Sequence, residues 1–171
     1  GAGSPSFGRP RLEVERCGPT TLPDMPKTAL VIEHDAWTPS GMIGEAAIER
    51  GFELVRMRST VGEHVELGDP RRADIILVTG SAEHWHEVDQ HPQLQRELAF
   101  VNTALEASVP IFGMCFGGQA LALALGGTVE PSPRRELGWF EIETADPRVI
   151  PPGPWFEWHH DRYVAPPSAE N

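Results

Sequence analysis

The stretch "VPIFGMCFGGQALALALGG", residues 109–127, decides the fold expected for this chain. Its first part, 109–114, is a compact apolar run that predicts a short buried strand. Its second part, 117–125, predicts a helix that Gly126 and Gly127 bring to an end, because glycine commonly terminates helices. A strand followed within two residues by a helix is typical of α/β proteins.

A cysteine lies at the corner between these two elements. Gly113, Cys115 and Gly117 form the pattern G-x-C-x-G, the thiol version of a nucleophile elbow. The glycines allow a tight turn, and the start of the following helix favours the thiolate form of the sulfur. The backbone amide of Phe116 can point at a developing oxyanion. The pattern therefore favours a nucleophilic Cys115 over a buried structural cysteine.

The elements before this corner alternate between strand and helix. Residue Ser40 is expected as the N-cap of the first helix, and Pro92 stands near the first turn of the second. The order βαβ…βαβα predicts an α/β fold with an open, mostly parallel sheet flanked by helices. The expected strands cover 28–34, 52–57 and 73–80, and the expected helices cover 41–50 and 91–107.

After residue 128 the pattern changes to short strand candidates separated by proline-rich turns. These candidates are 128–130, 139–143 and 155–160. We expect an irregular N-terminal extension over 1–26 and one domain over 27–171. The domain looks C-terminally incomplete, because no final strand or helix follows the last candidate.

Composition excludes several classes of function. The 171 residues include 14 Lys and Arg against 25 Asp and Glu, a net charge of −11. This balance argues against nucleic acid and anionic membranes as partners. Two cysteines, Cys17 and Cys115, are too few for a disulfide framework. With no signal peptide or long apolar stretch in view, a cytoplasmic location is expected.

At the cysteine corner the chain resembles a known family. "PIFGMCFGGQALALALGG" is similar to the nucleophile segment of class I glutamine amidotransferases, G-x-C-x-G-x-Q, with Gln119 as the last element. The likeness extends to "DIILVTGSAEHW", which resembles the strand that carries the family's oxyanion loop. It also covers 29–58, 136–143 and 156–170. The resemblance implies a flavodoxin-like three-layer fold.

The resemblance also implies a reaction. Cys115 would attack the side-chain amide of glutamine and form a γ-glutamyl thioester. The backbone amides of Gly80 and Phe116 would hold the oxyanion, and Gln119 would contribute to substrate binding. No cofactor and no metal are expected. In this family the ammonia passes to a partner synthetase or acceptor domain.

One part of the family's machinery has no counterpart in the sequence. The family's base is a histidine in a late F-H-P-E-like segment, and no such segment is found here. Three interpretations stay open. In the first, which we favour, the chain is a piece of a longer protein, and this predicts slow turnover by the chain as given. In the second, the chain is a degenerate binding or scaffold module. In the third, His159 or His160 acts as the base. By resemblance His159 matches the histidine of a W-H-G-D motif, which is not the base.

Other candidate residues receive less weight. The segment "EHWHEVDQH" holds His84, His86 and His91 together with Glu83 and Asp89, which makes a zinc or copper site conceivable. A polar loop is the preferred interpretation, and the same holds for "HHD" at 159–161. Core packing is expected for most of the tryptophans Trp85, Trp155 and Trp158.

A cysteine at such a corner also occurs in two other classes of protein. A γ-glutamyl cysteine hydrolase would use the same nucleophile. A protein of the DJ-1 type would place a glutamate beside the cysteine, and Glu33 in "VIEHD" is the candidate for that position. Gln119 and the later segments fit the amidotransferases better.

Overall fold

The computed structural model describes residues 26–60, 66–166 and 169. The expected extension therefore lies, apart from Pro26, outside the described residues, and so does Cys17. The elements are β1 (Lys27–Glu33), α1 (Gly41–Glu49), β2 (Phe52–Arg58), η1 (Pro70–Arg72), β3 (Ile75–Val78), η2 (Trp85–Gln90), α2 (Pro92–Glu106), β4 (Ile111–Gly113), α3 (Phe116–Ala124), β5 (Thr128–Phe140) and β6 (Trp155–Val164).

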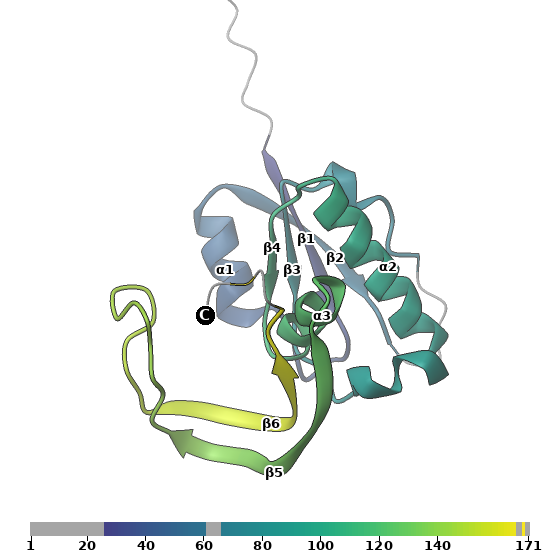
Figure 1. Ribbon diagram of the computed structural model, residues 1–171. Coiled ribbons are helices and arrows are strands. Elements are labelled where there is room, and N and C mark those ends of the chain that lie inside the picture. The colour runs from purple at the N-terminus through teal and green to yellow at the C-terminus, as the bar shows by residue number, and fades with distance from the viewer. Residues whose placement is uncertain (1–25, 61–65, 167–168, 170–171) are drawn as a thin grey trace, which may run out of the picture.

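Four strands form an open, fully parallel sheet in the order β2-β1-β3-β4. This confirms the α/β class that the sequence predicts. Helix α1 lies on one side of the sheet, and α2 lies on the other (Figure 1). The two central strands are apolar without alternation because helices cover both of their faces. Their side chains Leu30, Ile32, Ile76 and Val78 pack with Phe100 and Ala104 of α2.

Helix α2 turns a mainly apolar face toward the core, and one carboxylate lies on that face. Leu94 and Val101 are buried, and Pro92 occupies the start of the helix as expected. That carboxylate is Glu97, which lies on the same buried face with no solvent exposure. A charged side chain in such a place requires a partner, and the candidate site supplies it.

Ser40 is the N-cap residue of α1, as the sequence predicts. Its side chain makes no capping hydrogen bond, since its own backbone is helical, with φ −60° and ψ −22°. A side-chain cap requires extended geometry at that position. Instead, the backbone N–H of Ser40 donates to the Glu33 carboxylate at 3.0 Å.

Strands β5 and β6 form a separate antiparallel hairpin that curves away from the sheet (Figure 1). The structure merges the first two strand candidates into one strand that ends at Phe140, so the expected strand over 139–143 is wrong in its limits. The pairing register shifts between Pro131 and Glu136. An irregularity is needed there because a proline cannot donate a hydrogen bond to the partner strand.

The hairpin leaves much of its apolar surface in solvent. Trp155 and Trp158 are 42% and 65% exposed, so core packing is the wrong expectation for them. Trp85, in contrast, is 1% exposed and belongs to the core as expected. Among the described residues, no helix combines the length and apolar character needed to cross a membrane.

Candidate active site

Cys115 occupies the corner between β4 and α3, as the sequence predicts. It is the residue before the first turn of α3, it is exposed, and its backbone has φ 54° and ψ −109°. A non-glycine residue at positive φ costs on the order of 1–3 kcal/mol and is held only where the surroundings enforce it. Such strain is common at functional sites, and the strained residue here has an exposed side chain.

The flanking glycines enforce this corner through close packing. A Cβ on Gly117 would collide with the carbonyl oxygen of Val78 and lie 2.8 Å from its Cβ. A Cβ on Gly113 would collide with the backbone of Gly117 and lie 2.7 Å from the nitrogen of Gly118. The start of α3 therefore rests directly on β3 and β4, and only glycine fits at both positions.

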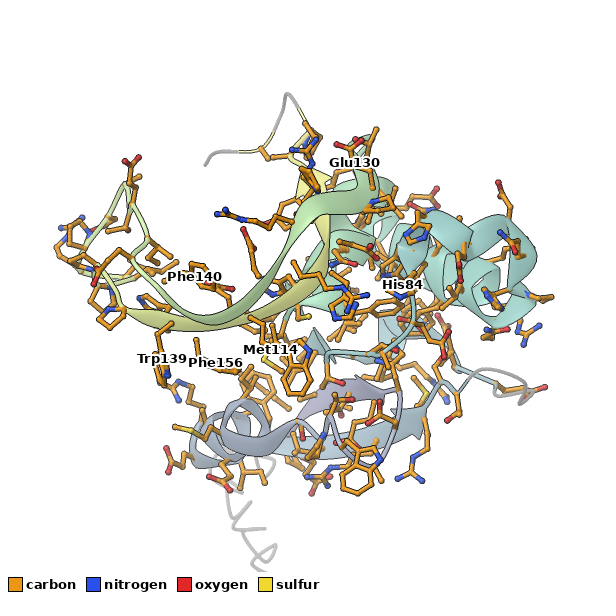
Figure 2. All side chains as sticks on the ribbon, turned by 90° about the horizontal axis from the view of Figure 1, so that it is seen from below. His84, Met114, Glu130, Trp139, Phe140 and Phe156 are labelled. Atoms are coloured by element: carbon orange, nitrogen blue, oxygen red, sulfur yellow. The ribbon has the colours of Figure 1, made fainter. Side chains whose placement is uncertain are left out.

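The corner opens into a cavity of about 850 Å³. Its lining comes from the segments after β1 and β3, from the cysteine corner and from β6. All four residues that the family resemblance assigns to the site line it, namely Gly80, Cys115, Phe116 and Gln119. In Figure 2 the curved β5–β6 hairpin lies beside Met114, and Trp139 and Phe156 are on the same side of the hairpin as Met114. The cavity lies at the carboxyl ends of the strands, the usual ligand position in open α/β folds.

Glu33 is not part of this lining. It is buried, accepts a hydrogen bond from the Ser40 amide and lies 3.6 Å from the Nε of Arg56. It therefore positions the start of α1 and does not face the thiol, which removes the argument for a protein of the DJ-1 type.

The backbone amides of Gly80 and Phe116 lie in the lining of the same cavity as Cys115. In the described part of the chain, neither the N–H of Gly80 nor that of Phe116 donates a hydrogen bond. A Cβ built on Gly80 would lie 3.9 Å from the Cβ of Cys115, so the two residues are neighbours across the cavity. The amide of Phe116 is the first of α3, where the helix dipole favours negative charge.

The structure brings His159 of β6 next to Cys115. The neighbouring Cys115 side chain, with a further contribution from Glu157, raises the pKa of His159 above 6.5 although partial burial opposes the shift. Its Nδ1 lies 3.0 Å from Glu157 Oε2 and 3.6 Å from Glu136 Oε2. A thiol, an imidazole and a carboxylate thus follow one another in space. This is the arrangement that activates a cysteine nucleophile.

A signal for this arrangement is present in the sequence. Glu157 and His159 are two residues apart on a strand, and such residues share one face of a strand. Glu136 pairs directly with His159 across the hairpin. The pairing itself could not be read from the sequence, because the register shift within β5 changes which residues meet.

A buried histidine–carboxylate pair lies next to Gly80 and Phe116. His34 Nε2 lies 2.9 Å from Glu97 Oε1, and His34 Nδ1 lies 3.0 Å from the carbonyl oxygen of Gly80. A carbonyl can only accept, so Nδ1 carries a proton. The His34 ring also packs edge-on against Phe116, with centroids 4.8 Å apart. One imidazole therefore contacts both Gly80 and Phe116.

Phe116 is held from its other side by Trp85. The two rings stack with centroids 4.7 Å apart, and Trp85 Nε1 donates to the carbonyl of Phe116 at 2.9 Å. Sequence reasoning missed the roles of His34 and Glu97. The available signal is the position of Glu97, three residues after Leu94 and four before Val101, on the apolar face of α2.

The histidines of the segment after β3 do not form one group. His84 and His86 both face Asp161 of β6, whereas His91 lies 3.5 Å from Glu87 within its own turn. His160 stacks beside His84 with ring centroids 6.1 Å apart. The three histidines that the sequence groups together therefore have different partners. His84 and His86 contact the carboxylate of Asp161 on β6, and His91 contacts Glu87.

Comparison with known proteins assigns the chain to a family. The family model described as glutamine amidotransferase class-I matches residues 41–165. A GMP synthase [glutamine-hydrolyzing] of Streptomyces coelicolor is 31% identical over 122 residues, which cover 71% of this chain and 21% of that protein. The corresponding protein of Rhodopseudomonas palustris is 49% identical over 53 residues, or 31% of this chain and 10% of that protein.

Solved structures agree on the fold. A glutamine amidotransferase from Thermotoga maritima matches with a TM-score of 0.75 and 24% identity, covering 86% of this chain and 66% of that one. A second, from Methylobacillus flagellatus, matches with a TM-score of 0.67 and 25% identity over 83% of this chain and 59% of that one. The chain spans about a tenth to a fifth of the length of the two GMP synthases it matches.

Proposed function

Because the chain belongs to the class-I glutamine amidotransferase family, we propose that it hydrolyses the side-chain amide of glutamine, with Cys115 as the nucleophile. The observation that carries the proposal is the strained corner of Cys115, which faces a cavity together with His159 and two free backbone amides. Acyl transfer needs a nucleophile, a base and oxyanion donors within reach of one carbonyl carbon.

The first half of the reaction forms an acyl-enzyme. We propose His159 in place of the base that the family resemblance puts in a later segment, because its imidazole lies next to Cys115. His159 takes the proton of the Cys115 thiol, and the sulfur attacks the amide carbon as the carbonyl electron pair moves onto oxygen. The amides of Gly80 and Phe116 donate to this oxyanion, and each such donor is worth about 10²–10³ in rate. When the carbonyl re-forms, the carbon–nitrogen bond breaks. The imidazolium of His159 protonates the leaving nitrogen, which departs as ammonia.

The second half restores the thiol. A water molecule gives a proton to His159 as it attacks the thioester, and a second oxyanion forms at the same two amides. Collapse of that intermediate breaks the carbon–sulfur bond, returns the proton to sulfur and releases glutamate. The sum is glutamine plus water to glutamate plus ammonia. Glu157, 3.0 Å from Nδ1 of His159, orients the imidazole and stabilises its charged form.

The fate of the ammonia follows from the relatives. Two matched proteins are described as glutamine-hydrolysing GMP synthases, and they are far longer than this chain. We propose that the ammonia is likewise passed to a synthetase, either a partner protein or a further domain. No cofactor enters the chemistry of amide hydrolysis itself.

The test is ammonia release from glutamine by the parent chain and three variants. Cys115→Ala is expected to abolish release, and His159→Gln to reduce it by about 10²–10⁴, the usual contribution of a general base. His160→Gln removes the neighbouring imidazole and is expected to have the smaller effect. Equal rates for the parent and Cys115→Ala would overturn the proposal.

Three other outcomes would change the assignment of function or of the base. A chain that binds glutamine but releases no ammonia would be a binding module, the second function that the sequence leaves open. Release that persists in both histidine variants would mean that the base lies outside the described residues. Release from γ-glutamyl peptides but not from glutamine would identify a γ-glutamyl hydrolase with the same nucleophile.

A further inference from the structure

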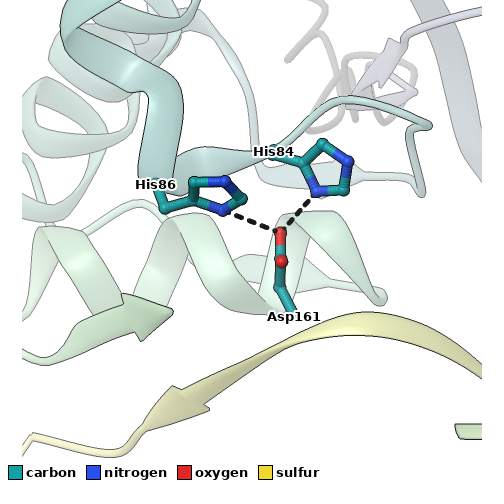
Figure 3. Close-up of side chains that lie close together, drawn as sticks. All are labelled: His84, His86 and Asp161. Atoms are coloured by element: carbon teal, nitrogen blue, oxygen red, sulfur yellow. Dashed lines mark hydrogen bonds and ion pairs between the residues drawn. The ribbon is translucent and has the colours of Figure 1, made fainter. Parts of the chain in front are cut away.

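Two histidines and an aspartate gather at the edge of the cavity, where the hairpin meets the segment after β3. Figure 3 shows the carboxylate of Asp161 between the rings of His84 and His86. Asp161 Oδ2 lies 2.7 Å from His84 Nδ1 and 3.4 Å from His86 Nδ1. One ligand atom from each residue lies within 4.8 Å of the others.

The environment of Asp161 favours a bound cation. Its side chain is only 4% exposed, and in the described part of the chain its ion-pair partners are the two imidazoles, with no lysine or arginine. A buried carboxylate is destabilising unless a positive charge or strong donors compensate. A neutral imidazole offers a hydrogen bond but no charge, whereas a divalent cation would offer both binding and charge.

The donor set indicates which cation. Two imidazole nitrogens and one carboxylate oxygen are ligands that suit zinc, whereas calcium and magnesium prefer oxygen alone. Zinc bonds of ~2.0–2.2 Å in tetrahedral geometry put neighbouring ligand atoms about 3.3 Å apart. The His86–Asp161 distance of 3.4 Å already fits, and the His84–Asp161 contact must open by a fraction of an ångström.

The backbone holds the histidines in a fixed segment. Trp85, which stands between them in the sequence, is 1% exposed and stacks on Phe116 in the core. Asp161 comes from the middle of β6, 75 or more residues further along the chain. The ligand set comes from two anchored segments, and its atoms lie up to 4.8 Å apart, so the two imidazoles must move closer to share one ion.

We propose that His84, His86 and Asp161 form a zinc site, with Nδ1, Nδ1 and Oδ2 as the three protein ligands and water in the fourth position. The ion joins β6 to the segment after β3 at the rim of the Cys115 cavity. The proposal does not depend on the reaction proposed above, since it rests on different side chains.

The test is calorimetric titration of the full chain with zinc chloride. Both cysteines are first replaced by serine, so that thiolates cannot bind the metal. In this background His86→Ala, an exposed position, and Asp161→Asn, which keeps the side-chain shape, are expected to lower zinc affinity. The loss should exceed the ~10–100-fold that removal of an outer-shell partner costs. His91→Ala, in the same segment but outside the cluster, is the matched control and should bind as the background does.

Cobalt substitution provides a second readout. An intense visible absorption indicates tetrahedral coordination, and that band should disappear in His86→Ala. Circular dichroism shows whether each variant keeps its fold. The inference is overturned if the cysteine-free chain binds no zinc, or if binding survives both His86→Ala and Asp161→Asn. It is also overturned if only the chain with Cys115 intact binds the metal.

Discussion

The parallel sheet with its helices and the β5–β6 hairpin differ in the solvent exposure of their apolar side chains. Ile32 and Ile76 of the sheet are fully buried, whereas Leu137 and Trp158 of the hairpin are 63% and 65% exposed. Both regions nevertheless line the same cavity. The sheet supplies Cys115, and the hairpin supplies His159.

This difference in burial indicates which region contributes most to folding free energy and which mainly contributes side chains to the site. Burial of apolar surface is the main source of folding free energy, so the sheet unit carries most of it. The hairpin buries little and contributes side chains that face the thiol. Substitutions in the sheet unit should therefore cost stability first, and substitutions in the hairpin should cost activity or pH response first.

The largest effect is expected at the buried pair beneath the cavity. Glu97→Ala leaves the buried His34 ring without its hydrogen-bond partner and leaves a cavity in the core, which together cost about 3–5 kcal/mol. Urea denaturation measures the loss. Arg96→Ala, an exposed neighbour on α2, is the control and should change stability little. A loss at Glu97 no larger than at Arg96 would contradict the account of the sheet unit.

The cysteine corner should show the next largest effect. Gly117→Ala brings a Cβ into the carbonyl of Val78, and such overpacking costs typically ~1–3 kcal/mol. Gly118→Ala is the matched control on the same helix. Its Cβ would meet only the Gly113 oxygen, at 3.5 Å, and alanine is the better helix former. Equal destabilisation by the two changes would show that Gly117 is not packed closely against Val78.

The contribution of His159 in the hairpin to stability should depend on pH. The pKa of His159 is raised in the folded chain, so its protonated form stabilises the fold. That contribution is fully present below the unfolded value of about 6.5 and is lost as pH rises through the higher folded value. The melting temperature of His159→Gln should fall below that of the parent in mildly acidic buffer and converge with it in alkaline buffer. A constant difference across this range would argue against the contact with Cys115 and Glu157.

The smallest effect is expected at the exposed apolar face of the hairpin. Leu137→Ala should change the free energy of unfolding by less than about 0.5 kcal/mol, the usual range for exposed positions. The matched change in the sheet, Ile76→Ala, should cost about 2–5 kcal/mol. If the two costs were similar, the hairpin would have to be buried in the protein in solution.

The same difference explains what could be predicted from the sequence. Strands buried on both faces, such as Ile75–Val78, give continuous apolar runs, and the corner at Cys115 has a local signature. Both depend on neighbours along the chain. The hairpin's pairing and the Glu97–His34 contact depend on segments far apart in sequence. Prolines also interrupt the alternation that would have marked β5 as one strand.

The most direct test of the central claim, that Cys115 is an activated nucleophile in a glutamine site, is covalent capture by an electrophilic glutamine analogue. Peptide mass mapping would follow modification of Cys115 and Cys17 over time, with and without glutamine as competitor. The account predicts rapid modification of Cys115, slowed by glutamine and by His159→Gln, while Cys17 reacts slowly. Equal rates at the two cysteines, or no protection by glutamine, would contradict it.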